Sequence, residues 1–248
     1  MKTLSVDIGN TSISLGLFKD GELVSTKKIS QNGFNLKKLN GLKKNFFNKD
    51  TKKIIISSVV PECDFIFKKF LTDNLLDFYF LKKLRKKINL KINLKKKSEI
   101  GDDRIANIIF AKEKFNKSLI IVDFGTATTL DVLNKFGVYH GGVITPGIEV
   151  SLNTLKNKTA KLPLVKFAKT TRVVGFNTRE AIQSGFFWGY CSMIEGLIKR
   201  IVKEQNDEFN IVLTGGNASY FNNIFENVIL IDEFFTSKAL NFILNKYT

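Results

Sequence analysis

One short motif occurs twice in this chain, about half a chain apart. Residues 7–11 are Asp-Ile-Gly-Asn-Thr, and residues 123–127 are Asp-Phe-Gly-Thr-Ala. Each copy follows an apolar run and precedes a second stretch rich in β-branched residues. This is the pattern of a buried strand, a tight turn and a second strand. Two copies predict two similar halves that face one phosphate-bearing ligand.

The segments around each copy extend the repeat to a β-β-β-α-β-α-β order in each half. The expected strands are 1–7, 12–18, 22–29, 53–60, 78–81, 119–123, 128–133, 137–144, 210–213 and 228–231. The expected helices are 34–48, 65–74, 104–115, 178–203 and 237–247. The repeated order predicts a duplicated α/β fold with mixed sheets. We place the boundary so that the domains are 1–112 and 113–248.

The composition is that of an ordinary globular protein. With 248 residues, of which 44% are hydrophobic, the chain is long enough for two domains of about 120 residues each. It contains no run of about 18 uncharged apolar residues and no signal-peptide pattern. Its two cysteines, Cys63 and Cys191, lack metal-ligand or redox spacing. We therefore expect a cytoplasmic protein with reduced thiols and no membrane partner.

The formal net charge is +16, and most of the excess is lysine. The densest basic run is 82–87, and three further lysines follow at 95–97. Such charge attracts nucleic acid, membrane surfaces or anionic metabolites. Because no helix-turn-helix, zinc-finger or RNA-binding signature accompanies it, we interpret these lysines as a solvated basic face and expect no nucleic-acid partner.

The Asp-x-Gly turns have the residue types that phosphate chemistry requires. Glycine lets backbone N–H groups approach a phosphate, and the carboxylate can hold a hydrated Mg²⁺. A single copy would be read as an ordinary turn, but two copies in matching strand contexts favour a phosphate site. Thr214-Gly215-Gly216 follows a strand and supports nucleotide binding. Neither a Walker loop nor a dinucleotide-binding glycine fingerprint is present.

Gly101-Asp102-Asp103-Arg104 places two carboxylates and a guanidinium before a helix. A carboxylate can take the proton from an attacking hydroxyl, and the arginine can hold an anionic substrate. The alternative is a helix N-cap with acids favoured by the helix dipole. Both interpretations hold if Asp102 serves the cap and Asp103 serves chemistry.

Together these segments resemble the type III pantothenate kinase family over nearly the whole chain. The segments are 7–11, 57–61, 101–104, 123–127, 141–142 with 146–147, 177–178 and 214–216. The family belongs to the superfamily of sugar kinases, heat-shock chaperones and actin. The resemblance therefore implies duplicated ribonuclease-H-like domains of the actin-like ATPase type. The first would hold one phosphate motif and the pantothenate motif, and the second would hold the other phosphate motif, the adenosine motif and an interface helix.

The resemblance implies ATP-dependent phosphorylation of pantothenate to 4′-phosphopantothenate, the first step of coenzyme A biosynthesis. It implies ATP, Mg²⁺ and a monovalent cation (K⁺ or NH₄⁺) as cofactors, and a homodimer whose interface involves helix 178–203. Asp103 would be the general base and Asp123 the ligand of the monovalent cation. The implied ATP-binding residues are Asp7, Ile8, Gly9, Asn10, Thr11, Ser12, Ile13, Ser14 and Thr126. The implied pantothenate-binding residues are Gly101, Asp102, Asp103, Arg104 and Thr178.

The chain departs from the family pattern at three positions. Leu94 and Lys97 stand where the family usually has Tyr and Pro, and Asp102 stands where a small or apolar residue is common.

Other function classes fit parts of the sequence. A kinase or phosphatase of the same superfamily, acting on a sugar or acetate, is disfavoured by the Gly-x-Asp-Arg segment and the short chain. A non-catalytic regulatory or nucleic-acid-binding protein is supported only by the charge, and both Asp-x-Gly motifs and Asp103 argue against it. An actin-like filament protein would be longer.

Overall fold

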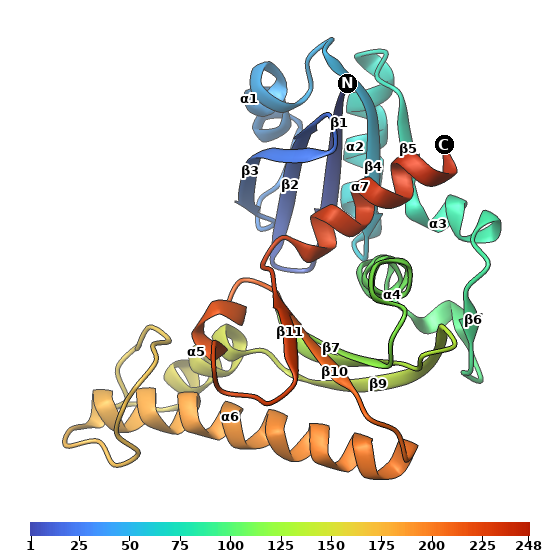
Figure 1. Ribbon diagram of the computed structural model, residues 1–248. Coiled ribbons are helices and arrows are strands. Elements are labelled where there is room, and N and C mark those ends of the chain that lie inside the picture. Colours follow the sequence, from blue (N-terminus) through green and yellow to red (C-terminus); the bar gives the residue numbers. More distant parts are fainter. The chain divides into compact units, whose positions relative to one another are not determined.

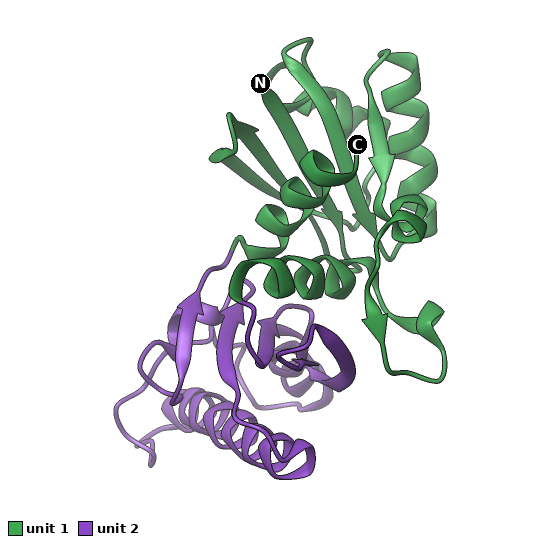
Figure 2. Ribbon diagram, turned by 45° about the vertical axis from the view of Figure 1, so that its right-hand side comes forward, with its two compact units in different colours: residues 1–115, 234–248 green, residues 116–233 purple.

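The computed structural model describes all 248 residues. The chain divides into two compact units: unit 1 comprises residues 1–115 and 234–248, and unit 2 comprises residues 116–233 (Figure 2). Each unit combines helices with a mixed sheet (Figure 1). The predicted class, a duplicated α/β fold with mixed sheets, is confirmed.

The sheet of unit 1 has the strand order β3-β2-β1-β4-β5. Its strands are β1 (Lys2–Ile8), β2 (Ser12–Lys19), β3 (Glu22–Ser30), β4 (Thr51–Ser58) and β5 (Phe78–Phe80). The first three form an antiparallel meander, whereas β4 runs parallel to β1 and β5 runs parallel to β4. The meander is predicted correctly because alternating apolar residues and Gly-containing turns are local signals.

Two helix pairs cover the two faces of this sheet. On one face, Leu4, Val6 and Ile8 of β1 pack with apolar residues of α1 (Leu36–Phe46) and α2 (Pro61–Asp73). The other face contacts α4 (Asp102–Phe115) and α7 (Phe235–Tyr247). There the Thr3 hydroxyl donates to Asn241 Oδ1 on α7 at 2.6 Å. This second face also bears Asp7, because side chains alternate along a strand.

Unit 2 repeats the topology of unit 1. Its strands are β7 (Leu119–Phe124), β8 (Ala127–Leu133), β9 (Val138–Pro146), β10 (Asn210–Thr214) and β11 (Val228–Ile231). They are arranged β9-β8-β7-β10-β11, which matches β3-β2-β1-β4-β5 strand for strand. Again the first three are antiparallel, and β10 and β11 run parallel to β7. The repeat inferred from two short motifs therefore extends to all the strands of unit 2.

The core of unit 2 joins the sheet to α5 (Ile148–Lys158) and α6 (Thr178–Gln205). The rings of Phe124 and Phe221 stack at 4.3 Å between centroids. The start of α6 is fixed by a capping box, in which Asn177 accepts the N–H of Glu180 and Glu180 accepts the N–H of Phe176. The helix ends at Asn206, which adopts a left-handed conformation at φ 49°.

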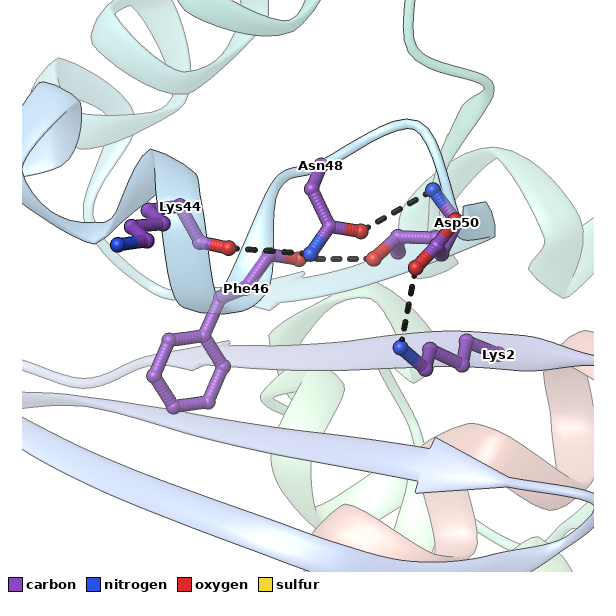
Figure 3. A network of polar contacts seen from close by, with 6 residues as sticks. Lys2, Lys44, Phe46, Asn48 and Asp50 are labelled. Carbon is purple, nitrogen blue, oxygen red and sulfur yellow. Dashed lines mark hydrogen bonds and ion pairs between the residues drawn. The ribbon is translucent and has the colours of Figure 1, made fainter.

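A small polar network joins the end of α1 to the start of β4 (Figure 3). Asn48 donates to the Lys44 carbonyl and accepts the N–H of Asp50, both at 3.0 Å. Asp50 also pairs with Lys2 of β1 at 3.2 Å. These bonds satisfy the backbone groups where the helix stops and the chain turns into the central strands.

The structure also contains elements that the sequence analysis did not predict. These are α5, α3 (Leu81–Leu84), β6 (Lys91–Ile92) and the 3₁₀ helices η1 (Arg85–Lys87), η2 (Lys97–Glu99) and η3 (Ala218–Phe221). Where the repeat predicted a second helix between the last two strands, only the four-residue η3 is present. Helix α2 begins at Pro61 instead of residue 65, because proline is well accommodated in a first helical turn. None of the helices is long and apolar enough to span a membrane.

Candidate active site

Asp7 lies near the end of β1, in a row of polar side chains that crosses three strands. Its register partners are Ser14 on β2 and Ser57 on β4. The turn that follows is closed by a 3.0 Å bond from the Gly9 N–H to the Ser12 carbonyl. Ile8 and Ile13 are core residues, so a role for them in ATP binding would fall to their backbone. The β1–β2 turn thus presents a carboxylate, hydroxyls and backbone amides at one sheet end.

The same row is repeated in unit 2. Asp123 near the end of β7 has Thr129 of β8 and Thr214 of β10 as register partners. The hydroxyls of Thr129 and Thr214 are buried and have no hydrogen-bond partner in the structure. Sequence analysis identified Asp123, and named Thr214 only as part of the motif Thr214-Gly215-Gly216. It missed Thr129, whose signal is its place in the same repeat as Ser14.

Two glycines, Gly147 and Gly215, allow their own backbone segments to pack closely against the second Asp-x-Gly turn. Gly215, at φ +87°, has its Cα against Asp123 and the Phe124 backbone, where a Cβ would collide with both. Gly147 donates its N–H to the Thr126 carbonyl at 3.1 Å and likewise leaves no space for a Cβ. The Thr126 loop is therefore held from one side by β10 and from the other by the end of β9. Thr178, the first residue of α6, is exposed.

Helix α4 begins at the pantothenate-type motif. The Gly101 carbonyl accepts the Ile105 N–H at 3.1 Å. Asp103 is partly exposed, and its Oδ1 accepts the Arg104 N–H at 2.8 Å. Asp102 is only 5% exposed and forms an ion pair with Nη2 of Arg85. The predicted capping role of Asp102 stays a prediction, and the ion pair gives its carboxylate a second possible structural role.

Three carboxylates, those of Asp7, Asp102 and Asp103, act on one another in unit 1. Burial, together with the charges of Asp103 and Asp102, raises the pKa of Asp7 to about 7, although Ser57 and Lys28 act to lower it. Burial also raises the pKa of Asp102, although the Arg85 guanidinium opposes this shift. The site therefore has a strong negative potential, which favours a cation or a proton.

No group of three or more His, Cys, Asp or Glu side chains is arranged to enclose a metal ion. The carboxylates fit Mg²⁺ in another way, since this ion usually keeps several waters and is held by one or two carboxylates plus substrate phosphates.

Arg85 is a residue of this region that sequence analysis did not identify. It lies in the lysine-rich run 82–87, which we interpreted as a solvated face. Lys82, Lys83, Lys86 and Lys87 are indeed exposed, but Arg85 is only 23% exposed. Because its partner is 17 residues away along the chain, no local pattern distinguishes it from the lysines around it.

A sequence model of the type III pantothenate kinase family matches residues 3–200. The chain belongs to this family. It is 41% identical to the type III pantothenate kinase of Sulfurihydrogenibium sp. (strain YO3AOP1), an alignment that covers 98% of this chain and 99% of the relative. The corresponding protein of Pelagibacter ubique (strain HTCC1062) is 40% identical over 94% of this chain and 95% of its own length. The chain is thus a member of a kinase family over nearly its full length.

Solved structures show the same fold at much lower identity. A putative Baf family transcriptional activator from Campylobacter jejuni superposes with a TM-score of 0.64 at 19% identity, covering 98% of both chains. A putative N-acetylmannosamine kinase from Listeria monocytogenes superposes with a TM-score of 0.55 at 12% identity, covering 99% of both chains. These likenesses show that this chain shares the fold of those proteins.

Proposed function

We propose that this protein transfers the γ-phosphoryl group of ATP to the hydroxyl of pantothenate, giving 4′-phosphopantothenate, the first step of coenzyme A biosynthesis. The observation that supports this most directly is the start of α4. There Asp103 is partly exposed, lies two residues after Gly101, and its negative charge acts on Asp7. Membership of the type III pantothenate kinase family supplies the identity of the acceptor.

Asp103 is the proposed general base. Its carboxylate takes the proton of the pantothenate hydroxyl as that oxygen attacks the γ-phosphorus. The bond from the Arg104 N–H to Oδ1 fixes the orientation of the carboxylate. Gly101, Arg104 and Thr178 are the proposed pantothenate contacts. Asp102 is buried, so it would meet the substrate through its backbone only.

The β1–β2 turn is the proposed first phosphate loop, formed by residues 7–14, and Thr126 is a further ATP contact. Backbone N–H groups next to Gly9 can approach phosphate oxygens, because no side chain stands in their way. Asp7 would hold hydrated Mg²⁺, whose charge neutralises the phosphates. Its raised pKa supports this role, because a cation bound there relieves the repulsion among the three carboxylates.

Asp123 is the proposed ligand of the monovalent cation. The unpaired hydroxyl oxygens of Thr129 and Thr214 lie on either side of it in the sheet, and oxygen donors are the ligands that hard cations prefer. We propose K⁺ or NH₄⁺ at this position.

A homodimer is proposed from the surface of unit 2. A groove of about 510 Å³ lies between α5 and α6, and Leu155, Phe186 and Met193 are among its mainly apolar lining residues. Gly185 and Gly189 leave the α6 backbone open there, so another helix can approach closely. We further propose that the enzyme acts in the cytoplasm, and we retain the domain assignment 1–112 and 113–248.

Mass-spectrometric analysis of the reaction products tests the proposed acceptor. The protein is incubated with MgATP and K⁺ together with pantothenate, N-acetylmannosamine or acetate in separate reactions. We expect a phosphorylated product only from pantothenate. Phosphorylation of the sugar or of acetate, with none of pantothenate, would contradict the proposal and support another kinase of the same fold.

A further inference from the structure

One guanidinium nitrogen links two points of the turn that leads into α4. Nη2 of Arg85 donates to the Ile100 carbonyl at 2.8 Å and also pairs with Oδ1 of Asp102. Gly101 lies between these two acceptors. Arg85 therefore bonds the residue before Gly101 and the residue after it at the same time.

The turn has little freedom on its other side. A Cβ at position 101 would collide with Oδ1 of Asp103 and would lie 3.6 Å from Cγ1 of Val59. The position of the Asp103 carboxylate thus depends on where the Gly101 backbone lies. Whatever fixes residues 100–102 also fixes the proposed general base.

The chemistry of arginine suits this role. A guanidinium presents several donors in a rigid plane, so it can hold two acceptors at once, whereas a lysine ammonium is a flexible point charge. Asp102 is almost fully buried, and a buried carboxylate without a partner is strongly destabilising. The charged groups that act on it are Arg85 and Lys82 from the preceding segment and Asp103 from its own helix.

We propose that Arg85 is a positioning residue for phosphoryl transfer, because it fixes the turn 100–102 through Asp102 and the Ile100 carbonyl and so holds Asp103 against the acceptor hydroxyl. This inference rests on the proposed function of Asp103. It assigns Asp102, where the family commonly has a small or apolar residue, to the support of the turn instead of to the substrate.

Steady-state kinetics of Arg85→Ala and Arg85→Lys, varying pantothenate and ATP separately, test the proposal. We expect Arg85→Ala to lower kcat about 10- to 100-fold, since misplacing a catalytic group by about 1 Å costs on this order. The KM for ATP should stay within about twofold, because the hydrogen bond and the ion pair of Arg85 go to residues 100 and 102 and not to the first phosphate loop. Arg85→Lys should recover part of kcat, since it keeps the charge but not the two-acceptor geometry. The matched control is Lys87→Ala, which removes an exposed charge two residues away and should behave as the wild type.

A double-mutant cycle with Asp102→Ala shows whether the effect passes through Asp102. If it does, Asp102→Ala lowers kcat in the wild-type background but by less than about twofold in the Arg85→Ala background. Multiplicative losses would overturn the proposal, as would wild-type kcat in both Arg85 variants. A variant in which kcat, the affinity for ATP and the melting temperature all fall together would also overturn it, because that pattern indicates general destabilisation. A wild-type protein without pantothenate-dependent turnover would instead contradict the proposed function.

Discussion

At the scale of single residues, the three carboxylates of unit 1 have different surroundings, and we propose different roles for them. Asp102 is buried and paired with Arg85, Asp7 is crowded by the other two, and Asp103 is partly exposed at the start of α4. Asp103 combines partial exposure with a carboxylate that the Arg104 N–H orients. This difference is why we assign proton transfer to Asp103 and cation binding to Asp7.

Replacement of Asp103 by Asn should lower kcat about 10²- to 10⁴-fold, the usual loss when a general base is removed. The amide keeps the shape of the side chain and can still accept the Arg104 N–H, so the affinity for ATP should change little. Single-turnover kinetics and isothermal titration with an ATP analogue measure the two quantities. Near-normal turnover in this variant would remove Asp103 from the proposed role.

Asp7 should make the stability of the metal-free protein depend on pH. Its folded-state pKa of about 7 lies above the ordinary aspartate pKa of 3.8, so the folded state binds the proton more tightly than the unfolded state. Its contribution is therefore fully present below about pH 4 and is lost as the pH rises through 7. Asp7→Asn removes this titration. As the pH rises from 4 to 8, the free energy of unfolding of the variant should therefore increase by about 2–4 kcal/mol relative to that of the wild type.

Urea denaturation in EDTA at several pH values measures this difference, with the exposed Asp73→Asn as the control. Parallel stability profiles for wild type and Asp7→Asn would show that Asp7 is not the group that titrates.

At the scale of elements, the close approach of α7 to the unit 1 sheet depends on a glycine. A Cβ at Gly16 of β2 would lie 2.8 Å from the Ser5 hydroxyl and 3.1 Å from Cβ of Ser237 on α7. Gly16→Ala should therefore destabilise the protein by about 1–3 kcal/mol through overpacking. Gly41→Ala provides a control of opposite sign, since this exposed position in α1 has no atom within 4 Å of the added methyl.

The control should stabilise the protein by about 0.5–1 kcal/mol, because alanine is the better helix former. Thermal unfolding of both variants measures the effects. A Gly16→Ala protein as stable as the Gly41→Ala protein would contradict the described packing of α7.

Local sequence signals predict most of these elements, whereas contacts distant in sequence are not predictable from them. The meanders follow from alternating residues and Gly turns, and α6 follows from its Asn177 cap and apolar spacing. Helix α5 was missed because Val150, Ser151, Asn153 and Thr154 have low helix propensity, and it depends on burial of Ile148 and Leu152. The packing of α7 on β1 and β2 joins residues that are more than 200 positions apart in the chain. The ion pair of Arg85 with Asp102 is likewise a tertiary contact.

The same contrast holds for the candidate site. Asp7, Asp103 and Asp123 were identified from motifs, because each lies in a short contiguous segment whose residue types are visible in the sequence. Ser57, Thr129 and Thr214 stand beside the aspartates only through strand register, which forms after the sheet is assembled.

At the scale of the whole molecule, the proposed homodimer predicts a concentration-dependent mass. The chain has a mass of 28.1 kDa, so the wild type should elute at about twice that value in size exclusion with light scattering. Gly189→Arg places a charged side chain in the open groove on α6 and should shift the mass toward the monomer. Lys203→Glu, at the distant end of the same helix, is the control. A monomeric wild type would refute the dimer.

The initial rate of ADP release is the most direct test of the proposed pantothenate kinase reaction. The rate is measured with and without pantothenate, first in K⁺ buffer and then in Na⁺ buffer. We predict release that requires pantothenate and is much faster in K⁺, since Asp123 with Thr129 and Thr214 would bind the larger ion. Release without pantothenate dependence in either buffer, or no release at all, would contradict the assignment.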